Sequence, residues 1–471
     1  MITKFTPRHY FWIVLIAFLA GCGIRPQDKT GSATATILTP ISKVTLLPIL
    51  PTYAPPRESP TPRAETLTAL PTIPPTATSS LQPPSCTFPL AHKVVAESKP
   101  VNYTFSEPKV VLTVFGNLYS IIEWLPDNQQ VLMTEDLISS RELESDKMLR
   151  QSIQLYNPET GESKVYATRY QTDAPPAWLA ASNAIVYPAM NFLGRENDSN
   201  RIKFTRQVWV SHGDPQVVQL LADNLTQFPL AIKPDGSEMV FLSDRQLSKR
   251  DALLQPIPSV SFDPMDWDYL EKRNQMPVSY RMAWQPGTSL IFLYSDGSQL
   301  GGGDTFLLDA NSGKICELNL DGWALRAVWS PNGQYLAVTR TQGEVPIKFS
   351  DLLILDSKTG HIYNAKVAPQ EMIGNHYVDD LAWAPDNYHL LANGKVFLTR
   401  STGSIDSNQS GLYLIDFVAG ESARILPRNE FYANSAQNNL AWSSDGSKLL
   451  ALCPTAEEER VCSISVHRTG Q

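Results

Sequence analysis

The sequence has few histidines and fewer bases than acids, and both shortages argue against particular kinds of site. Its seven histidines stand singly, and none pairs at the His-x-His or His-x-x-x-His spacing of a metal site. Lysine and arginine number 39 against 47 aspartates and glutamates, and no basic stripe runs along the chain. We therefore expect no metal, no cofactor and no nucleic-acid partner.

Motifs for covalent catalysis and phosphate binding are also missing. No Gly-x-Ser-x-Gly sequence occurs, so there is no strained turn that would present a nucleophilic serine. The run Gly301 to Gly303 precedes a predicted strand rather than a helix, and therefore does not predict a phosphate loop. We find no catalytic motif and expect a protein that is not an enzyme.

The first 21 residues have the layout of an export signal. Lys4 and Arg8 precede the apolar run from Phe11 to Ala20, which is too short to cross a bilayer but suits a signal peptide. The sequence Leu19-Ala20-Gly21-Cys22 resembles a bacterial lipobox. That resemblance implies that residues 1–21 are removed and that Cys22 receives lipid. We expect a protein of the cell envelope, outside the cytoplasm, anchored to a membrane without spanning it. The alternative is an ordinary secretory signal followed by a chance cysteine.

Residues 22–96 are predicted to be a disordered tether. Between residues 24 and 85 the sequence contains 13 prolines, many threonines and serines, and few charges. No helix or strand period is present, so such a segment cannot bury enough apolar surface to offset its conformational entropy. The tether is expected to hold the remaining domain, residues 97–471, away from the membrane.

That remaining domain repeats one turn. In Trp329-Ser330-Pro331-Asn332-Gly333 the proline presets φ and the glycine accepts a positive φ, which indicates a tight turn between two strands. The run that follows, Gln334 to Thr339, is apolar on both faces, as a strand packed between two sheets requires. Similar turns begin at Trp124, Trp178, Ile232, Trp284, Trp383 and Trp442. The first residue of each of the seven turns, Trp329 included, is called its anchor below.

Seven copies with a period near 53 residues fit units of four short strands. Sheets that are apolar on both faces can pack radially, so we predict an all-β, seven-bladed β-propeller. The turn, together with a later Asp-x-x-x-Gly turn as in Asp356 to Gly360, resembles the repeat of TolB-like propellers of the WD40-like PD40 type. The last unit lacks a fourth strand, so we expect residues 109–114 to complete it and close the ring.

Four cysteines remain besides Cys22. Cys453 and Cys462 flank a predicted hairpin turn and could form a disulfide in an exported protein. The pairing of Cys86, at the end of the tether, with Cys316, in an outer strand, is left open.

The predicted propeller has two different faces. Short turns lie on one face, whereas the other collects long connections, among them residues 190–205 and 243–281. Function tends to lie on such loops. In TolB-like propellers the anchor strand is innermost, which implies that residues near the third position before each anchor approach the channel mouth. We call the residues at the channel mouth a possible ligand rim. Its charged and polar members are Arg281, Arg326, Asp379, Asp380 and Asn439.

We expect a monomeric propeller that binds or scaffolds a protein or peptide. Arg281 and Arg326 could grip a carboxylate, although the rim charges could equally be solvated or form salt bridges between blades. The alternative is a propeller enzyme, a polysaccharide lyase or hydrolase, with its site at the channel mouth. It would need several acids, histidines or a metal on the axis, whereas Asp379, Asp380 and His376 all come from one repeat.

Overall fold

The structure is a computed structural model that describes part of the chain. It covers Cys86, Thr172, Val367 and residues 102–114, 119–137, 150–170, 174–195, 202–225, 230–243, 245–263, 280–295, 305–320, 322–342, 349–365, 376–396, 409–427, 440–454 and 459–469. The predicted signal peptide, Cys22 and all of the predicted tether except Cys86 therefore lie outside the described residues. Within these ranges no helix is long and apolar enough to cross a membrane.

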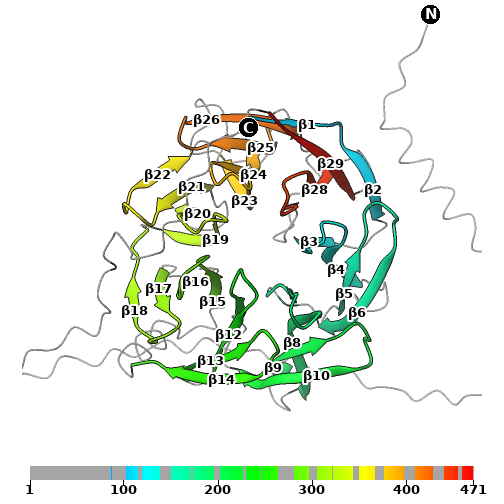
Figure 1. Cartoon of the computed structure of the whole chain (residues 1–471), viewed down its shortest axis with the longest axis vertical. Coiled ribbons are helices and arrows are strands. Elements are labelled where there is room, and N and C mark those ends of the chain that lie inside the picture. The colour runs from blue at the N-terminus through cyan, green and yellow to red at the C-terminus, as the bar shows by residue number, and fades with distance from the viewer. Residues whose placement is uncertain are drawn as a thin grey trace, which may run out of the picture. The chain divides into compact units, whose positions relative to one another are not determined.

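The described chain is all-β and forms seven antiparallel sheets, as predicted (Figure 1). Blade 1 contains β3 (Tyr119–Trp124), β4 (Val131–Leu137), β5 (Arg150–Tyr156) and β6 (Ser163–Tyr170). Blade 2 contains β7 (Ala177–Leu179), β8 (Ala184–Arg195), β9 (Ile202–Ser211) and β10 (Val218–Leu225). Blade 3 contains β11 (Leu230–Ile232), β12 (Glu238–Ser243), β13 (Gln246–Asp251) and β14 (Pro256–Ser261).

The later blades repeat this order. Blade 4 contains β15 (Tyr280–Trp284), β16 (Leu290–Ser295), β17 (Thr305–Asp309) and β18 (Ile315–Glu317). Blade 5 contains β19 (Trp323–Trp329), β20 (Tyr335–Gln342), β21 (Phe349–Asp356) and β22 (Ile362–Ala365). Blade 6 contains β23 (His376–Trp383), β24 (His389–Val396), β25 (Gly411–Asp416) and β26 (Glu421–Pro427). Blade 7 contains β27 (Leu440–Trp442), β28 (Lys448–Pro454) and β29 (Glu459–Thr469).

Two N-terminal strands complete blade 7 and close the ring. β2 (Lys109–Val114) pairs antiparallel with the first half of β29, as predicted. β1 (Asn102–Phe105), which the sequence analysis did not predict, pairs with the second half. The chain between them stays close to β29, because the Ser106 N–H donates to the Ser465 carbonyl at 3.0 Å. The outer strand of blade 7 is therefore built from two pieces in line.

The repeated turn forms as its sequence predicts. Gly333 has a φ of 73°, and a Cβ there would lie 2.5 Å from the Pro286 carbonyl oxygen of the preceding turn. Glycine is therefore required at this position by backbone conformation and by the close approach of blade 4. In blades 1 and 6, Asn128 and Asn387 adopt a similar φ, of 55° and 66°, because asparagine tolerates this region better than most residues.

The anchor tryptophans link neighbouring inner strands. In three blades the indole N–H donates to a carbonyl on the inner strand of the preceding blade, at the residue just before that blade's own anchor. The donor and acceptor pairs are Trp124 with Ala441 at 3.1 Å, Trp329 with Ala283 at 3.0 Å, and Trp383 with Val328 at 3.0 Å. The first of these bonds joins blade 1 to blade 7, so it also contributes to ring closure.

Two of the predicted long connections are wrong. Residues 190–195 and 202–205 belong to β8 and β9, in which Asn191 pairs with Thr205. Residues 243–281 include β13 and β14, and Ser243 pairs with Gln246 across a tight turn. Sequence patterning missed β14, Pro256–Ser261, because it contains two prolines, which suit the outer edge of a sheet but not its interior.

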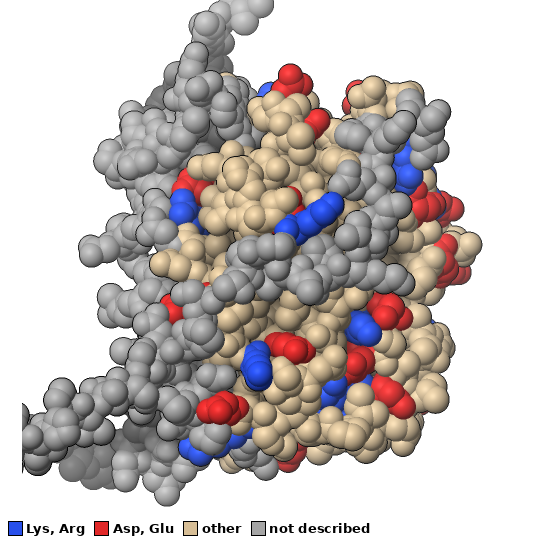
Figure 2. All heavy atoms as spheres, turned by 60° about the vertical axis from the view of Figure 1, so that its left-hand side comes forward, with Lys and Arg blue, Asp and Glu red and all other residues tan. Residues whose placement is uncertain are grey.

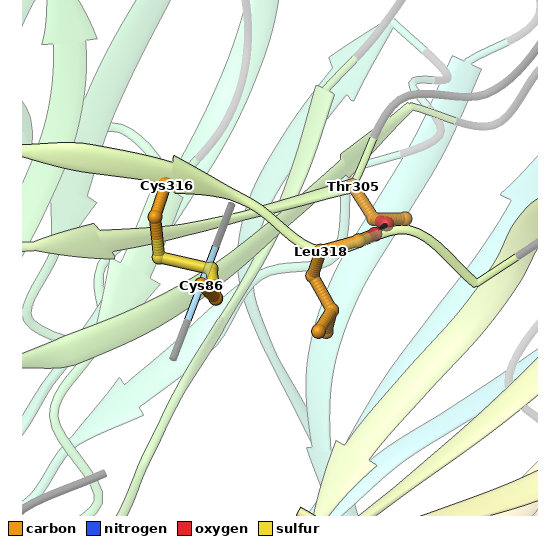
Figure 3. The surroundings of a disulfide bond; sticks show 4 residues. All are labelled: Cys86, Thr305, Cys316 and Leu318. Atoms are coloured by element: carbon orange, nitrogen blue, oxygen red, sulfur yellow. Dashed lines mark hydrogen bonds between the residues drawn. A yellow bond between two sulfur atoms is a disulfide. The ribbon is translucent and has the colours of Figure 1, made fainter. Parts of the chain in front are cut away.

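Both pairs of cysteines are joined. The Cys453–Cys462 disulfide links β28 to β29, as predicted. Cys86 and Cys316, whose pairing the sequence left open, also form a disulfide, across 230 residues of chain (Figure 3). The Cys86 N–H donates to the Glu317 carbonyl at 2.9 Å, so Cys86 lies against the outer strand of blade 4. The adjoining Thr305 hydroxyl donates to the Leu318 carbonyl.

Candidate functional site

Three inner strands carry an extra residue immediately before a charged one. Figure 1 shows β3, β15, β19 and β23 nearest the axis. The register with the second strand shifts just before Glu123 in β3, Arg326 in β19 and Asp380 in β23. Such bulges redirect side chains and often occur near functional sites. Because of these three bulges, we take the inner strands around the axis as the candidate site.

Arg326 and Asp380 form an ion pair between blades 5 and 6. The Arg326 Nη2 lies 2.7 Å from the Asp380 Oδ1, and the two side chains are 14% and 0% exposed. The same carboxylate oxygen accepts the backbone N–H of Leu381 at 2.9 Å. Of the two arginines predicted to grip a carboxylate, Arg326 is thus engaged with an acid of the neighbouring blade.

Arg281 lies on β15, the inner strand next to β19. Its side chain is partly exposed, and within the described part of the chain no hydrogen bond or ion pair reaches its guanidinium. Arg281, Arg326 and Asp380 together carry one excess positive charge. A guanidinium in this state can bind an anion, and a carboxylate fits its two-pronged donor geometry.

The structure describes the remaining rim residues only in part. Asp379 is the extra residue of the β23 bulge, and its side chain lies outside the described residues, as do the side chain of His376 and the whole of Asn439. Among the residues that the structure does describe, no group of three histidines, cysteines or acids could hold a metal ion.

Glu123 is a site residue that the sequence analysis missed. Its Oε1 accepts the Trp178 backbone N–H of blade 2 at 2.8 Å. Burial raises the pKa of Glu123 from 4.5 to about 7, against the lowering effect of this hydrogen bond. The sequence does set Glu123 apart, because the other six residues that directly precede an anchor are all alanine or valine.

A second polar group is buried between blades 1 and 2. Asp136, Gln151 and Arg169 lie opposite one another on β4, β5 and β6. Gln151 donates to Asp136 at 2.8 Å, and Arg169 donates to Gln151 at 2.7 Å and to the Pro188 carbonyl of blade 2 at 2.6 Å. Burial lowers the pKa of Arg169 to about 9. Since the three side chains bind one another, the row joins the two blades rather than offering a site.

Charges of both signs are mixed on the surface visible in Figure 2, which brings the side of β18 and β22 forward. Among the residues drawn in colour, lysines and arginines lie beside aspartates and glutamates, and no field of one sign is visible. This part of the surface therefore resembles a solvated exterior rather than a polyanion-binding face.

The fold and the inner-strand geometry define a seven-bladed β-propeller closed by N-terminal strands. No protein-family model matches the sequence, and no curated protein matches it. Solved structures of similar fold include the β-propeller domain of Cps50 (Swd1) from Myceliophteria thermophila, with 10% identity, 77% of this chain and 100% of that chain covered, and a TM-score of 0.46.

Two further similar structures are the β-propeller domain of the Trilobed protease from Pyrococcus furiosus and TolB from Acinetobacter baumannii. The first is 11% identical, covers 79% of this chain and 95% of its own, and has a TM-score of 0.40. The second is 10% identical, covers 69% and 78%, and has a TM-score of 0.33. At these identities and TM-scores the likeness carries no conclusion about an activity.

Proposed function

We propose that this chain is a lipid-anchored envelope propeller that binds a protein or peptide partner through a carboxylate near Arg281. The observation that supports the site is the partly exposed guanidinium on β15, which has no partner among the described residues. The neighbouring Arg326 is neutralised by Asp380 at 2.7 Å, so Arg281 is the cation in this group that can accept a new anion.

The lipid anchor at Cys22 and the envelope location rest on the lipobox-like sequence before Cys22. A membrane-attached propeller that presents near its axis an arginine with no partner in the described part of the chain suits capture of a peptide C-terminus or an acidic side chain. No arrangement of described side chains favours the enzymatic alternative, because Asp380 is bound to Arg326 and Glu123 to a backbone amide.

The test replaces Arg281 by alanine and measures partner recovery. Whole cells that express wild type or Arg281→Ala are crosslinked, and proteins bound to the propeller are quantified after solubilisation. Loss of a charge-assisted hydrogen bond worth about 2 kcal/mol corresponds to an affinity about 30-fold weaker, so recovery should fall strongly.

The matched control is Lys314→Ala. Lys314 is an exposed cation of the same blade, in the turn between β17 and β18 at the opposite end of the sheet. This variant should recover the partner as wild type does. Equal recovery by Arg281→Ala and Lys314→Ala would exclude the proposed site.

A further inference from the structure

The N-terminal part of the chain is attached to the propeller at two separate places. Cys86 is bonded to Cys316 on β18, the outer strand of blade 4, as Figure 3 shows. Residues 102–114 are paired with β29 of blade 7. The first attachment is covalent, whereas the second consists of backbone hydrogen bonds and the packing of two strands.

The second attachment is weak against a pull from the N-terminal side. Asn102, at the start of β1, pairs with Thr469, at the end of β29, and the pairing proceeds from there to Phe105 with Val466. The interstrand hydrogen bonds are perpendicular to the strands. A force on the start of β1 that is directed away from β29 would load the Asn102–Thr469 pair first and break the bonds one at a time, and the same opening would continue into β2.

A pull from the N-terminal side reaches the first attachment, the disulfide, before it reaches β1. Cys86 precedes β1 in the chain, so tension from residues before it reaches the disulfide first. Cys316 is held in blade 4 by its pairing with Leu307 of β17, and the Cys86 N–H adds a bond to the Glu317 carbonyl. Both cysteines also pack against a buried cluster that includes Phe292, Tyr294 and Leu336.

We propose that the Cys86–Cys316 disulfide is a tension guard that diverts any pull on the N-terminal segment into blade 4 and so protects the ring-closing strands. The source of the pull rests on the proposed membrane attachment through Cys22. The guard itself is a property of the folded chain and can be tested without lipid.

The experiment stretches single molecules of the full chain in optical tweezers. One handle is fused to the N-terminus, and the other is attached through a click-reactive residue at Val418, which is 58% exposed between β25 and β26 of blade 6. In the Cys86→Ser/Cys316→Ser variant we expect an early extension of about 45 Å at low force, the length of residues 102–114 released from blade 7. Wild type should show no such step before its main unfolding event.

The control variant is Cys453→Ser/Cys462→Ser. It also lacks one disulfide, within the hairpin that receives β2, but it keeps the guard and should show no early step. Hydrogen exchange without force should find the amides of β1 and β2 equally protected in wild type and in the variant without the guard. The inference fails if that variant first extends at the wild-type force, or if its β1 and β2 amides are already unprotected at zero force.

Discussion

At the scale of single residues, the contact between blades 1 and 2 differs from the contacts between blades 4 and 5 and between blades 5 and 6. Between blades 4 and 5, and between blades 5 and 6, an anchor indole donates to a neighbouring backbone carbonyl. Between blades 1 and 2 a carboxylate, Glu123, accepts a backbone N–H instead. A carboxylate can lose its charge, so this interface is expected to respond to pH.

We predict that Glu123→Gln stabilises the propeller above neutral pH. The folded-state pKa of about 7 lies above the ordinary 4.5. The stability that this group contributes is therefore complete below pH 4.5 and is lost as the pH rises to about 7. Glutamine keeps the acceptor oxygen and cannot ionise, so the variant should be more stable at pH 8 by on the order of 3 kcal/mol and similar at pH 4.5. Urea unfolding at both pH values measures this.

Glu162→Gln is the control, because Glu162 is an exposed glutamate of the same blade. Its unfolding should depend on pH as that of wild type does. If Glu123→Gln and Glu162→Gln gave the same pH profile, ionisation of Glu123 would not be coupled to folding.

At the scale of strands and turns, the features that could be predicted from the sequence are those that depend on neighbouring residues in the chain. The turn after Trp329 forms because Pro331 and Gly333 favour it wherever the strands lie, and six similar turns revealed the seven blades. The bulge before Asp380 accompanies an ion pair with Arg326 of the preceding blade, a residue 54 positions away, and leaves no local pattern. The Cys86–Cys316 bond joins residues 230 apart, one of them in a segment without periodicity, so spacing could not predict it.

The ring-closing strand β2 is expected to contribute to the stability of the propeller. Leu112 of β2 packs against the cluster of Ile121, Leu450 and Val461, which spans blades 1 and 7. Leu112→Asp would place a charge in this contact, and we expect the free energy of unfolding to fall by about 2 kcal/mol. The shift in the guanidinium chloride midpoint measures it.

Val110→Asp serves as the comparison, since Val110 lies on the same strand but is 40% exposed. Its midpoint should change little. Equal losses for the two variants would show that any charge on β2 disturbs the sheet, whether or not it faces the cluster.

At the scale of the whole molecule, the proposed function depends on the residues before the propeller. The sequence Leu19-Ala20-Gly21-Cys22 predicts lipid attachment. If that prediction holds, the propeller that follows is a rigid body held at the membrane. The fold could be predicted because its core repeats seven times. The partner could not, because a binding group such as Arg281 occurs once and has no periodic signature.

We predict that Cys22→Ser abolishes incorporation of labelled palmitate in bacteria that express the full chain. The diacylglycerol is attached to the cysteine sulfur, which serine lacks. Cys86→Ser should be labelled as wild type is, although it too removes a sulfur atom. Equal labelling of Cys22→Ser and wild type would refute the lipoprotein assignment.

Ring closure also constrains the order of events during biosynthesis. Ser106 and Ser465, which bond to each other, lie 359 residues apart, so β1 and β2 cannot pair with β29 until nearly the whole chain has been translated. The first strands must wait unpaired while the ribosome completes the others. Contacts so distant in sequence form slowly, and for an exported chain this delay would favour translocation before the ring can form.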